Sequence, residues 1–363
     1  MANITEKTTA RDYRISYIRA ISTVMVVGLH ILKELSYLFP SYYRFTEISD
    51  WCNLGLVMFF VISGFLYSGR TIEKNKTGKW FLRRYLELII PSLFTVIIAA
   101  VLVTAFKVRG DMDRSWILSA LFSGLGLHIL ASHGWMTYHY WFLSYILLCY
   151  LTVPLIQRID FHTMSTVRFW CLLIFATVFI QGVSFAMGLF TPLPTFSWGV
   201  LLRFYLPYAL FKRYNIKSNM CKKIMIIITL LSIILIPVAC VLRYYPGLLE
   251  RIGGVQELFY IYTQTLSGLS LFYWLYCAFD HIKAHIKLIK FTDTYSYPVY
   301  LTHGLFIGSE NSLSVISRFD NRFLGIAVAL ACTAVASFVV FRVTKPIKKL
   351  IIDKMEAAWA RNI

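Results

Sequence analysis

Charged residues are scarce in this sequence, and the polar stretches that mark soluble domains are missing. Only 15% of the 363 residues are charged, whereas 58% are hydrophobic and 17% are aromatic. Soluble domains carry about 25% charged residues, so this composition excludes a soluble protein. No linker or low-complexity run interrupts the chain. Any chemistry must take place in or at a lipid bilayer, which leaves transporters, channels, receptors and membrane enzymes.

Metal-binding and disulfide patterns are also absent. The seven cysteines have no CxxC or similar spacing and lie mostly in apolar stretches, which argues against a disulfide framework and a structural zinc site. His281 and His285 have i, i+4 spacing, but they lie in a basic loop without a third ligand. We therefore predict no metal site and no bound cofactor.

Acidic residues are half as frequent as basic ones. The 36 Lys and Arg against 18 Asp and Glu give a net charge of +18, which in a polar chain would indicate a nucleic-acid partner. Here the basic residues lie between long apolar runs, so we expect a lipid bilayer and no nucleic acid. The first apolar run lacks a small-residue cleavage pattern after it, which predicts a retained span rather than a signal peptide.

Apolar runs long enough to cross a bilayer are the main feature that is present. A membrane helix needs about 20 mostly apolar residues. Eleven segments are candidates, at approximately 15–38, 51–69, 85–106, 115–130, 138–157, 167–188, 196–211, 224–242, 259–279, 295–309 and 323–341.

The distribution of basic residues reduces eleven spans to ten. Cytoplasmic loops of membrane proteins are enriched in Lys and Arg, and eleven spans would place two basic loops on opposite sides. Without 115–130, which is short and rich in Gly and Ser, the cytoplasmic side holds 25 basic residues and the outer loops hold 8. We predict an all-α polytopic bundle of about ten spans with both termini cytoplasmic, and expect 115–130 to re-enter or lie on the membrane. The predicted segments are a cytoplasmic N-terminal part (1–14), a membrane domain (15–341) and a basic tail (342–363).

Ionisable residues within the spans are candidate site residues, because each costs about 2.5–3.5 kcal/mol to insert. Arg19 and His30 are eleven residues apart on one face of the first span and about 16 Å apart along its axis. Glu34 lies one turn beyond His30 on nearly the same face. The alternative interpretation is that Arg19 extends to the cytoplasmic headgroups and His30 is a hydrogen-bonded packing residue.

The second span contains a pair of small residues, and a basic loop connects it to the third span. Ser63 and Gly64 allow close helix approach, and this packing role is the alternative to a catalytic role for Ser63. Arg70, Arg83 and Arg84 lie on the cytoplasmic side. Positive-inside topology alone would explain them; binding of a phosphate-bearing ligand is the functional alternative. Glu87 is one turn from Arg83 and Arg84 and is their expected partner.

Further candidates lie in the later spans. Trp141 fits either an aromatic belt or a substrate-stacking surface. Arg203 is deep enough to need a partner, and either a ligand anion or a carboxylate elsewhere in the chain would serve. In the ninth span, Tyr300 lies one turn before His303, and Pro298, just before both residues, loosens the helix there.

Five motifs in order resemble the integral-membrane acyltransferase 3 family. They are Arg19-x10-His30, FFVISGF (59–65), a basic loop leading into a proline-bearing span, HYWFL (139–143) followed by YLTVP, and SYPVYLTH (296–303). The resemblance covers about residues 11–345. It is closest to the stand-alone branch that acylates envelope polysaccharides, since no extracellular esterase-like domain is attached.

The resemblance implies a membrane enzyme that moves an acyl group, usually acetyl from acetyl-CoA as co-substrate, to a carbohydrate hydroxyl. It also implies location in the bacterial cytoplasmic (inner) membrane, His30 as the catalytic residue and Arg19 as its functional partner. Many relatives carry a Glu shortly after the WFLS stretch, whereas this chain has Tyr145 and Ile146 there. No carboxylate role can be transferred to that place.

These expectations combine into a mechanistic hypothesis. Acyl-CoA docks from the cytoplasm, with its phosphates held by Arg70, Arg83, Arg84 and Arg19. His30 then removes the acceptor hydroxyl proton, a task for which an imidazole is suited at neutral pH, or carries the acyl group itself. Glu34 orients His30, and Ser63, Tyr300 or His303 stabilises the oxyanion, while Trp141 and Arg203 contact the acceptor. A saccharide transporter or flippase with a His/Glu proton pathway, and an acyltransferase with a non-sugar acceptor, are the rival interpretations.

Overall fold

The computed structural model describes residues 12–38, 51–106, 114–128, 138–190, 198–244, 255–282, 284, 286–307, 313 and 315–361. Within these ranges it contains eleven α-helices, short 3₁₀ turns and no β-strand. The helices are α1 (Tyr13–Leu38), α3 (Leu54–Ser68), α4 (Thr77–Phe106), α5 (Arg114–Gly124), α6 (Trp141–Ile156), α7 (Thr166–Phe190), α8 (Leu202–Arg213), α9 (Asn219–Tyr244), α10 (Val255–Ala278), α11 (Lys287–Phe306) and α12 (Arg322–Arg361). The 3₁₀ turns include η4 (Tyr138–Tyr140) and η5 (Trp198–Leu201).

The predicted all-α class is confirmed for the described residues, and the apolar helices fit a membrane bundle. Five helical segments are long and apolar enough to cross a bilayer, while α3 and α6 are apolar but shorter. The number of spans and the side of the termini stay predictions from the charge distribution. The five segments are Tyr13–Ser36, Lys74–Phe106, Thr166–Val183, Asn219–Leu242 and Arg322–Ala360.

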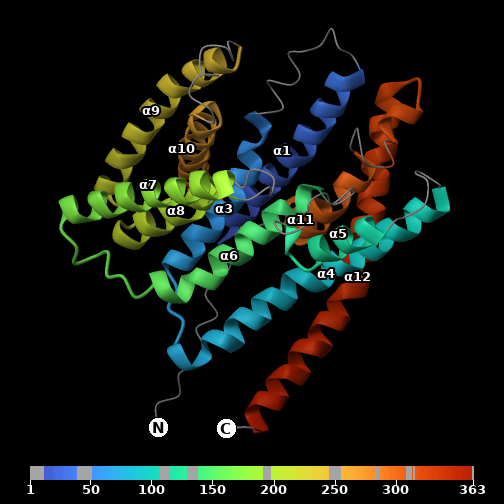
Figure 1. The fold of residues 1–363 in the computed structure, drawn as a ribbon, viewed down its shortest axis with the longest axis horizontal. Coiled ribbons are helices and arrows are strands. Elements are labelled where there is room, and N and C mark those ends of the chain that lie inside the picture. Colours follow the sequence, from blue (N-terminus) through green and yellow to red (C-terminus); the bar gives the residue numbers. More distant parts are fainter. Residues whose placement is uncertain are drawn as a thin grey trace.

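Helix α3 lies at the centre of the bundle and packs against α1, α8 and α10 (Figure 1). Its sequence contains no charged residue and is buried over most of its surface, as expected of a helix that is hydrophobic all round. A Cβ on Gly55 would lie 2.6 Å from the Ser22 carbonyl oxygen of α1, and a Cβ on Gly64 would overlap the Phe204 carbonyl of α8. The close-packing interpretation of Ser63 and Gly64 is therefore confirmed at Gly64.

The peripheral helices α7 and α9 show the opposite pattern. Large apolar side chains on both are more than half exposed, among them Val167 (73%), Phe175 (66%) and Ile234 (63%). Such continuous apolar faces would be unfavourable in water and are suited to contact with lipid chains. The contrast with α3 separates a packed interior from a surface that faces the bilayer.

The described part of segment 115–130, up to residue 128, forms a short helix followed by a turn. Helix α5 has 11 residues and is therefore only about 16 Å long, compared with a bilayer core of about 30 Å. The chain turns at Gly126, whose φ of +74° favours glycine. Tyr85 of α4 donates a hydrogen bond to the Leu125 carbonyl (3.2 Å). Helix α5 therefore packs on α4 and is too short to cross the bilayer by itself, while the ten-span count stays a prediction.

Helix α12 continues well past the predicted end of the tenth span. It is one helix of 40 residues with Pro346 inside it, so the expected boundary at 341/342 is not a break in secondary structure. Its C-terminal half runs beside the start of α4 (Figure 1). Arg83 pairs with Glu356 (3.4 Å), and the Lys79 ammonium lies over the Trp359 ring.

The start of α1 is tied to the ends of two later helices by an ion-pair network. Arg14 and Lys217 both pair with Asp280, at 2.5 and 2.9 Å. Lys217, which donates a hydrogen bond, and the Arg14 charge hold the pKa of Asp280 below its ordinary value. Tyr276 of α10 donates to Asp12 (2.9 Å). These contacts fix where α1 begins. They thereby fix the positions of Arg19 and His30 along the bundle axis relative to the other helices.

Candidate active site

Three buried histidines from three distant parts of the chain meet at the core of the bundle. His30 of α1, His139 of η4 and His303 of α11 are 8%, 3% and 0% exposed. The His30 and His303 ring centroids are 4.8 Å apart, and those of His139 and His303 are 4.9 Å apart. We call these residues the histidine cluster. They place three groups capable of proton transfer next to one another, away from solvent.

His139 is held by the ninth predicted span. Its Nε2 lies 3.2 Å from the Leu301 carbonyl, and the Tyr300 hydroxyl donates a hydrogen bond to the His139 carbonyl. The His139 ring lies against Gly304, where a Cβ would come within 2.5 Å of Nδ1. Glycine at 304 leaves room for this ring, which a Cβ would overlap.

His303 occupies the middle of the cluster. Its Nδ1 lies 3.1 Å from the Val299 carbonyl oxygen of the preceding turn. Among the described residues, no side chain or backbone group hydrogen-bonds to its Nε2. The Nε2 atom of His303 is therefore a buried imidazole nitrogen that is available to a reacting group or to a neighbouring ring.

Arg19 is paired with the carboxylate of Asp293, which is not among the site residues predicted from the sequence. Asp293 of α11, whose side chain is 0% exposed, contacts Arg19 Nη1 at 3.3 Å and accepts a 2.7 Å hydrogen bond from Ser16. Arg19 and His30 of α1 thus contact Asp293 and His303 of α11. The two helices run parallel, with separations of eleven and ten residues between the two contact levels, or about 15–16 Å.

The predicted cytoplasmic arginines lie in a half-exposed group near Arg19. Glu87 pairs with Arg83 (3.3 Å) and Arg84 (2.6 Å), which confirms the predicted i, i+4 and i, i+3 contacts. Tyr150 lies beside Ser63 and within electrostatic range of both Arg19 and Arg84. Arg70 is exposed and lies over the Tyr67 ring. We call Arg19, Arg70, Arg83 and Arg84 the arginine cluster.

Tyrosines connect the arginine cluster to the histidine cluster. Tyr297 of α11 is within electrostatic range of Tyr150 and Tyr140, and its ring stacks on Tyr300 with centroids 6.4 Å apart. Asp293, Tyr297 and Tyr300 follow at intervals of four and three residues, which places them on one face of α11. One helix face therefore links the two clusters with hydroxyl-bearing side chains.

Two predicted oxyanion ligands have other contacts in this arrangement. Ser63 lies at the arginine cluster beside Tyr150, and the Tyr300 hydroxyl is already donated to the His139 carbonyl. Their positions favour packing and support of the site. Glu34 is 2% exposed, and none of the described residues hydrogen-bonds to its Oε2. Arg322 is the cation within electrostatic range of Glu34.

Arg203 forms a separate buried polar contact. It is 2% exposed and donates from Nη2 to the Gln264 amide oxygen (2.9 Å), which also accepts from Asn53 (3.1 Å). Within the described ranges, no carboxylate pairs with Arg203. The sequence predicts an anionic partner for Arg203, whereas the structure gives it the neutral amide of Gln264. Trp141 is half-buried and contacts Tyr145, with ring centroids 5.7 Å apart, and Tyr145 lies within electrostatic range of Arg203.

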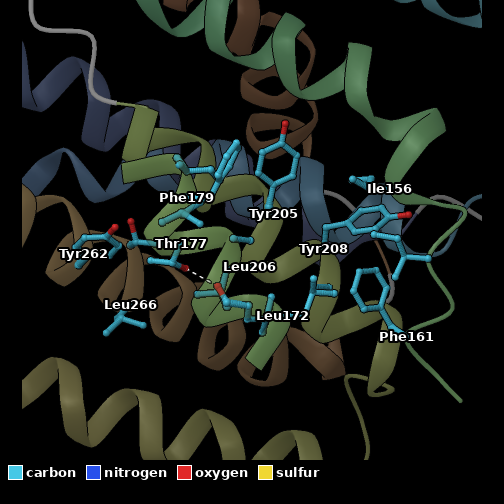
Figure 2. A pocket seen from close by; sticks show the side chains of 17 residues that line it. Ile156, Phe161, Leu172, Thr177, Phe179, Tyr205, Leu206, Tyr208, Tyr262 and Leu266 are labelled. Atoms are coloured by element: carbon cyan, nitrogen blue, oxygen red, sulfur yellow. Dashed lines mark hydrogen bonds between the residues drawn. The ribbon is translucent and has the colours of Figure 1, made fainter. Parts of the chain in front are cut away.

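A cavity of about 430 Å³ lies between α6, α7, α8 and α10 (Figure 2). Its lining is almost entirely apolar, with Leu172, Phe179, Leu206 and Leu266 among the side chains around it. None of the candidate site residues lines this cavity. It faces the sparsely packed helix α7 and belongs to the lipid-facing side of the bundle.

No metal centre is formed by the part of the chain that the structure describes. That part contains no group of three or more His, Cys, Asp or Glu side chains that could hold a metal ion. His285, the partner of His281 in the i, i+4 pair, lies outside the described residues. All seven cysteines have free thiols.

Comparison with known proteins identifies one similarity. A family model described as an acyltransferase domain, of the acyltransferase 3 type, matches residues 12–342. The matched region includes both the histidine cluster and the arginine cluster. Searches of curated proteins and of solved structures find no match to this chain.

Proposed function

This chain belongs to the acyltransferase 3 family, and from that premise we propose that it transfers an acyl group from cytoplasmic acyl-CoA to a hydroxyl of a cell-envelope carbohydrate. Acetyl is the proposed acyl group. The observation that carries the proposal is the pairing of α1 with α11, which holds a buried histidine cluster and an arginine cluster about 15–16 Å apart. A donor with phosphates at one end and a thioester at the other suits this arrangement.

The arginine cluster supports binding of the donor phosphates. Guanidinium groups bind phosphate oxygens through strong, often paired hydrogen bonds. Arg83 and Arg84 are 53% and 33% exposed; they share Glu87, and Arg83 also pairs with Glu356. These ion pairs face solvent, so a ligand phosphate can compete with the carboxylates for the guanidinium groups. Arg19 lies deeper, where it could contact the first part of the pantetheine arm. The hydroxyls of Tyr297 and Tyr300 between the clusters donate to the Leu88 and His139 carbonyls, and their oxygen lone pairs can still accept hydrogen bonds from the amides of this arm.

The histidine cluster supports the transfer step. In the proposed reaction, His30 removes the proton of the acceptor hydroxyl while the hydroxyl oxygen attacks the thioester carbon. The carbon–sulfur bond then breaks, and His30 returns the proton to the leaving thiolate of CoA. Burial of His30 keeps water from competing as the acceptor. General base catalysis of this kind contributes about 10²–10⁴-fold to a rate.

The proposed orientation in the membrane follows from the charge distribution. The 25 basic residues assigned to one side support a cytoplasmic location of the arginine cluster, where acyl-CoA is available. His30 then lies beyond the bilayer midplane, and an acceptor, lipid-linked or free, reaches it from the outer side. We accordingly propose location in the bacterial cytoplasmic membrane.

The central test measures acyl-CoA consumption by the purified protein in lipid nanodiscs with an envelope glycan extract as acceptor. We expect His30→Ala to lose at least about 10²-fold in transfer. The matched control is His162→Ala, because His162 is exposed in a loop outside the cluster. Wild-type transfer by the His30→Ala protein would refute the role of His30. Movement of glycan without acyl-CoA consumption would instead indicate a transporter.

The acceptor class is tested by mass spectrometry of envelope glycans from cells with and without the protein. We expect an acyl mass increment on a sugar hydroxyl only in cells that contain the wild-type protein. An increment on a peptide or lipid, with unmodified glycans, would retain acyl transfer and overturn the carbohydrate acceptor.

A further inference from the structure

The contacts of His303 fix which of its ring nitrogens carries the proton. A backbone carbonyl oxygen can only accept a hydrogen bond, and the Val299 carbonyl lies 3.1 Å from Nδ1. In the neutral ring this contact places the proton on Nδ1 and leaves a lone pair on Nε2. His303 therefore presents an acceptor, and no donor, at its second nitrogen.

This acceptor is buried without a hydrogen-bond partner among the described residues. His303 is 0% exposed, and its Nε2 makes no hydrogen bond with any described group. Leaving a buried acceptor unsatisfied is unfavourable, because the group loses water and gains no partner. Such a group in a native site calls for an explanation, and one explanation is a donor that forms during the reaction.

His30 is the residue best placed to become that donor. Its ring centroid lies 4.8 Å from that of His303, with the planes tilted by 49°, so a small ring rotation brings a nitrogen of each ring together. His139 flanks His303 on the other side and is held by the Leu301 carbonyl and Gly304. His303 is thus held in place while it faces His30.

We propose that Nε2 of His303 accepts a hydrogen bond from His30 when His30 takes the acceptor proton, and so stabilises the imidazolium form of His30 during acyl transfer. The proposal rests on the proposed function of His30. The acceptor proton moves to one nitrogen of His30, while the second N–H of His30 is donated to His303. His303 itself gains and loses no proton, and the proton leaves on the CoA thiol.

This role replaces the oxyanion role predicted from sequence. A neutral His303 whose N–H is directed at Val299 has no hydrogen to donate to a developing oxyanion. His303 is accordingly a positioning residue for His30. Its closest functional parallel is the hydrogen-bond acceptor that orients the histidine of a Ser-His-Asp triad.

A pair of isosteric variants tests the proposal. In His303→Gln the amide oxygen can reach the position of Nε2 and still accept from His30, whereas in His303→Asn the amide reaches only the position of Nδ1. We expect His303→Gln to keep kcat within about tenfold of wild type and His303→Asn to lose about 10²–10³-fold. The KM for acyl-CoA should remain the same in both, because the arginine cluster is unchanged.

The pH profile separates this role from simple packing. Removing the acceptor destabilises protonated His30, so the acid limb of kcat/KM should move to lower pH in His303→Asn. The other ionisable groups that face His30 are Lys33 on its own helix and His139 of η4, and both remain in each variant. Equal losses in the two variants with an unchanged acid limb, or wild-type kcat in His303→Asn, would overturn the proposal.

Two further outcomes keep the experiment decisive. If His303→Asn does not fold, His303→Leu, which offers no acceptor at the position of Nε2, takes its place: a lower kcat with the acid limb moved to lower pH supports the role, and wild-type values for both refute it. If His30→Ala is inactive while both His303 variants behave as wild type, the proposed function stands and this inference fails. A wild-type protein that consumes no acyl-CoA would refute the proposed function itself.

Discussion

The two clusters at the ends of the α1–α11 pair are held in different ways. In the histidine cluster, His139 and His303 hydrogen-bond to the backbone carbonyls of Leu301 and Val299, and all three histidines are nearly or fully buried. In the arginine cluster, Arg19, Arg83 and Arg84 pair with carboxylates and their side chains remain 32–53% exposed. Backbone carbonyls are fixed by the helices, whereas carboxylates can exchange their cation for a ligand.

This difference indicates a division of tasks between the two ends. A rigid, dry environment suits a step that depends on the placement of a proton within a fraction of an ångström. A hydrated and exchangeable ion-pair network suits a ligand that must bind and leave in every cycle. Substitutions should therefore act on kcat at the histidine cluster and on KM at the arginine cluster.

The largest effect should come from Gly304→Ala, which tests whether the histidine cluster is rigid. The added Cβ would come within 2.5 Å of the His139 ring, so the ring must move away from its position against α11. We expect kcat to fall by about 10²-fold, as for other displacements of catalytic groups by 1 Å. The KM for acyl-CoA should change little.

Gly28→Ala is the matched control. It lies on α1 two residues before His30, and nothing lies within 4 Å of its Cβ position. Steady-state kinetics of both variants would check the expectation. Similar kcat values for the two proteins would show that the cluster tolerates movement of His139.

An intermediate effect should come from Asp293→Asn, which removes the charge that holds Arg19. The amide can still accept from Ser16, but Arg19 loses its carboxylate in an environment that disfavours an unpaired charge. We expect the KM for acyl-CoA to rise about tenfold, with a smaller change in kcat. Asp293→Glu should restore part of the loss. A fall in kcat at unchanged KM would place Arg19 in the transfer step and weaken the division of tasks.

The smallest effects should come from the Arg84–Glu87 ion pair, where substitutions of the two partners should change the KM for acyl-CoA in opposite directions. Arg84→Ala removes a phosphate-binding group and should raise the KM for acyl-CoA about threefold to tenfold, with a loss that grows at high salt. Glu87→Gln frees Arg84 from its 2.6 Å partner and should lower the KM. Glu73→Gln, which affects an exposed pair with Lys76, is the control. Unchanged KM values in all three would assign these arginines to membrane topology alone.

The sequence predicts those features that depend on one helix. The separation of Arg19 from His30, the contacts of Glu87 with Arg83 and Arg84, and the close approach at Gly64 follow from helical spacing or residue size. The family also follows, because its motifs occur in order along the chain. Each of these features can be read from residues close together in the sequence, or from the motifs themselves, without knowledge of which helices are in contact.

The features that the sequence does not reveal depend on contacts between distant helices. His139 stands among aromatic residues, a composition that equally fits a membrane interface, and only the packing of η4 on α11 brings it to His303. Asp293 follows two lysines and is counted with a cytoplasmic loop, whereas α11 begins at Lys287 and carries it into the bundle. Helical periodicity contains no information about which helix face meets which neighbour.

The parallel pairing of α1 and α11 requires the axial distance between the two contact levels to be nearly equal on both helices. One inserted or deleted residue between Arg19 and His30, or between Asp293 and His303, would rotate one contact level by about 100° relative to the other. Donor binding and proton transfer would then lose their common axis although every residue is retained. The lengths of these two intervals are therefore as much a part of the active site as the side chains at their ends.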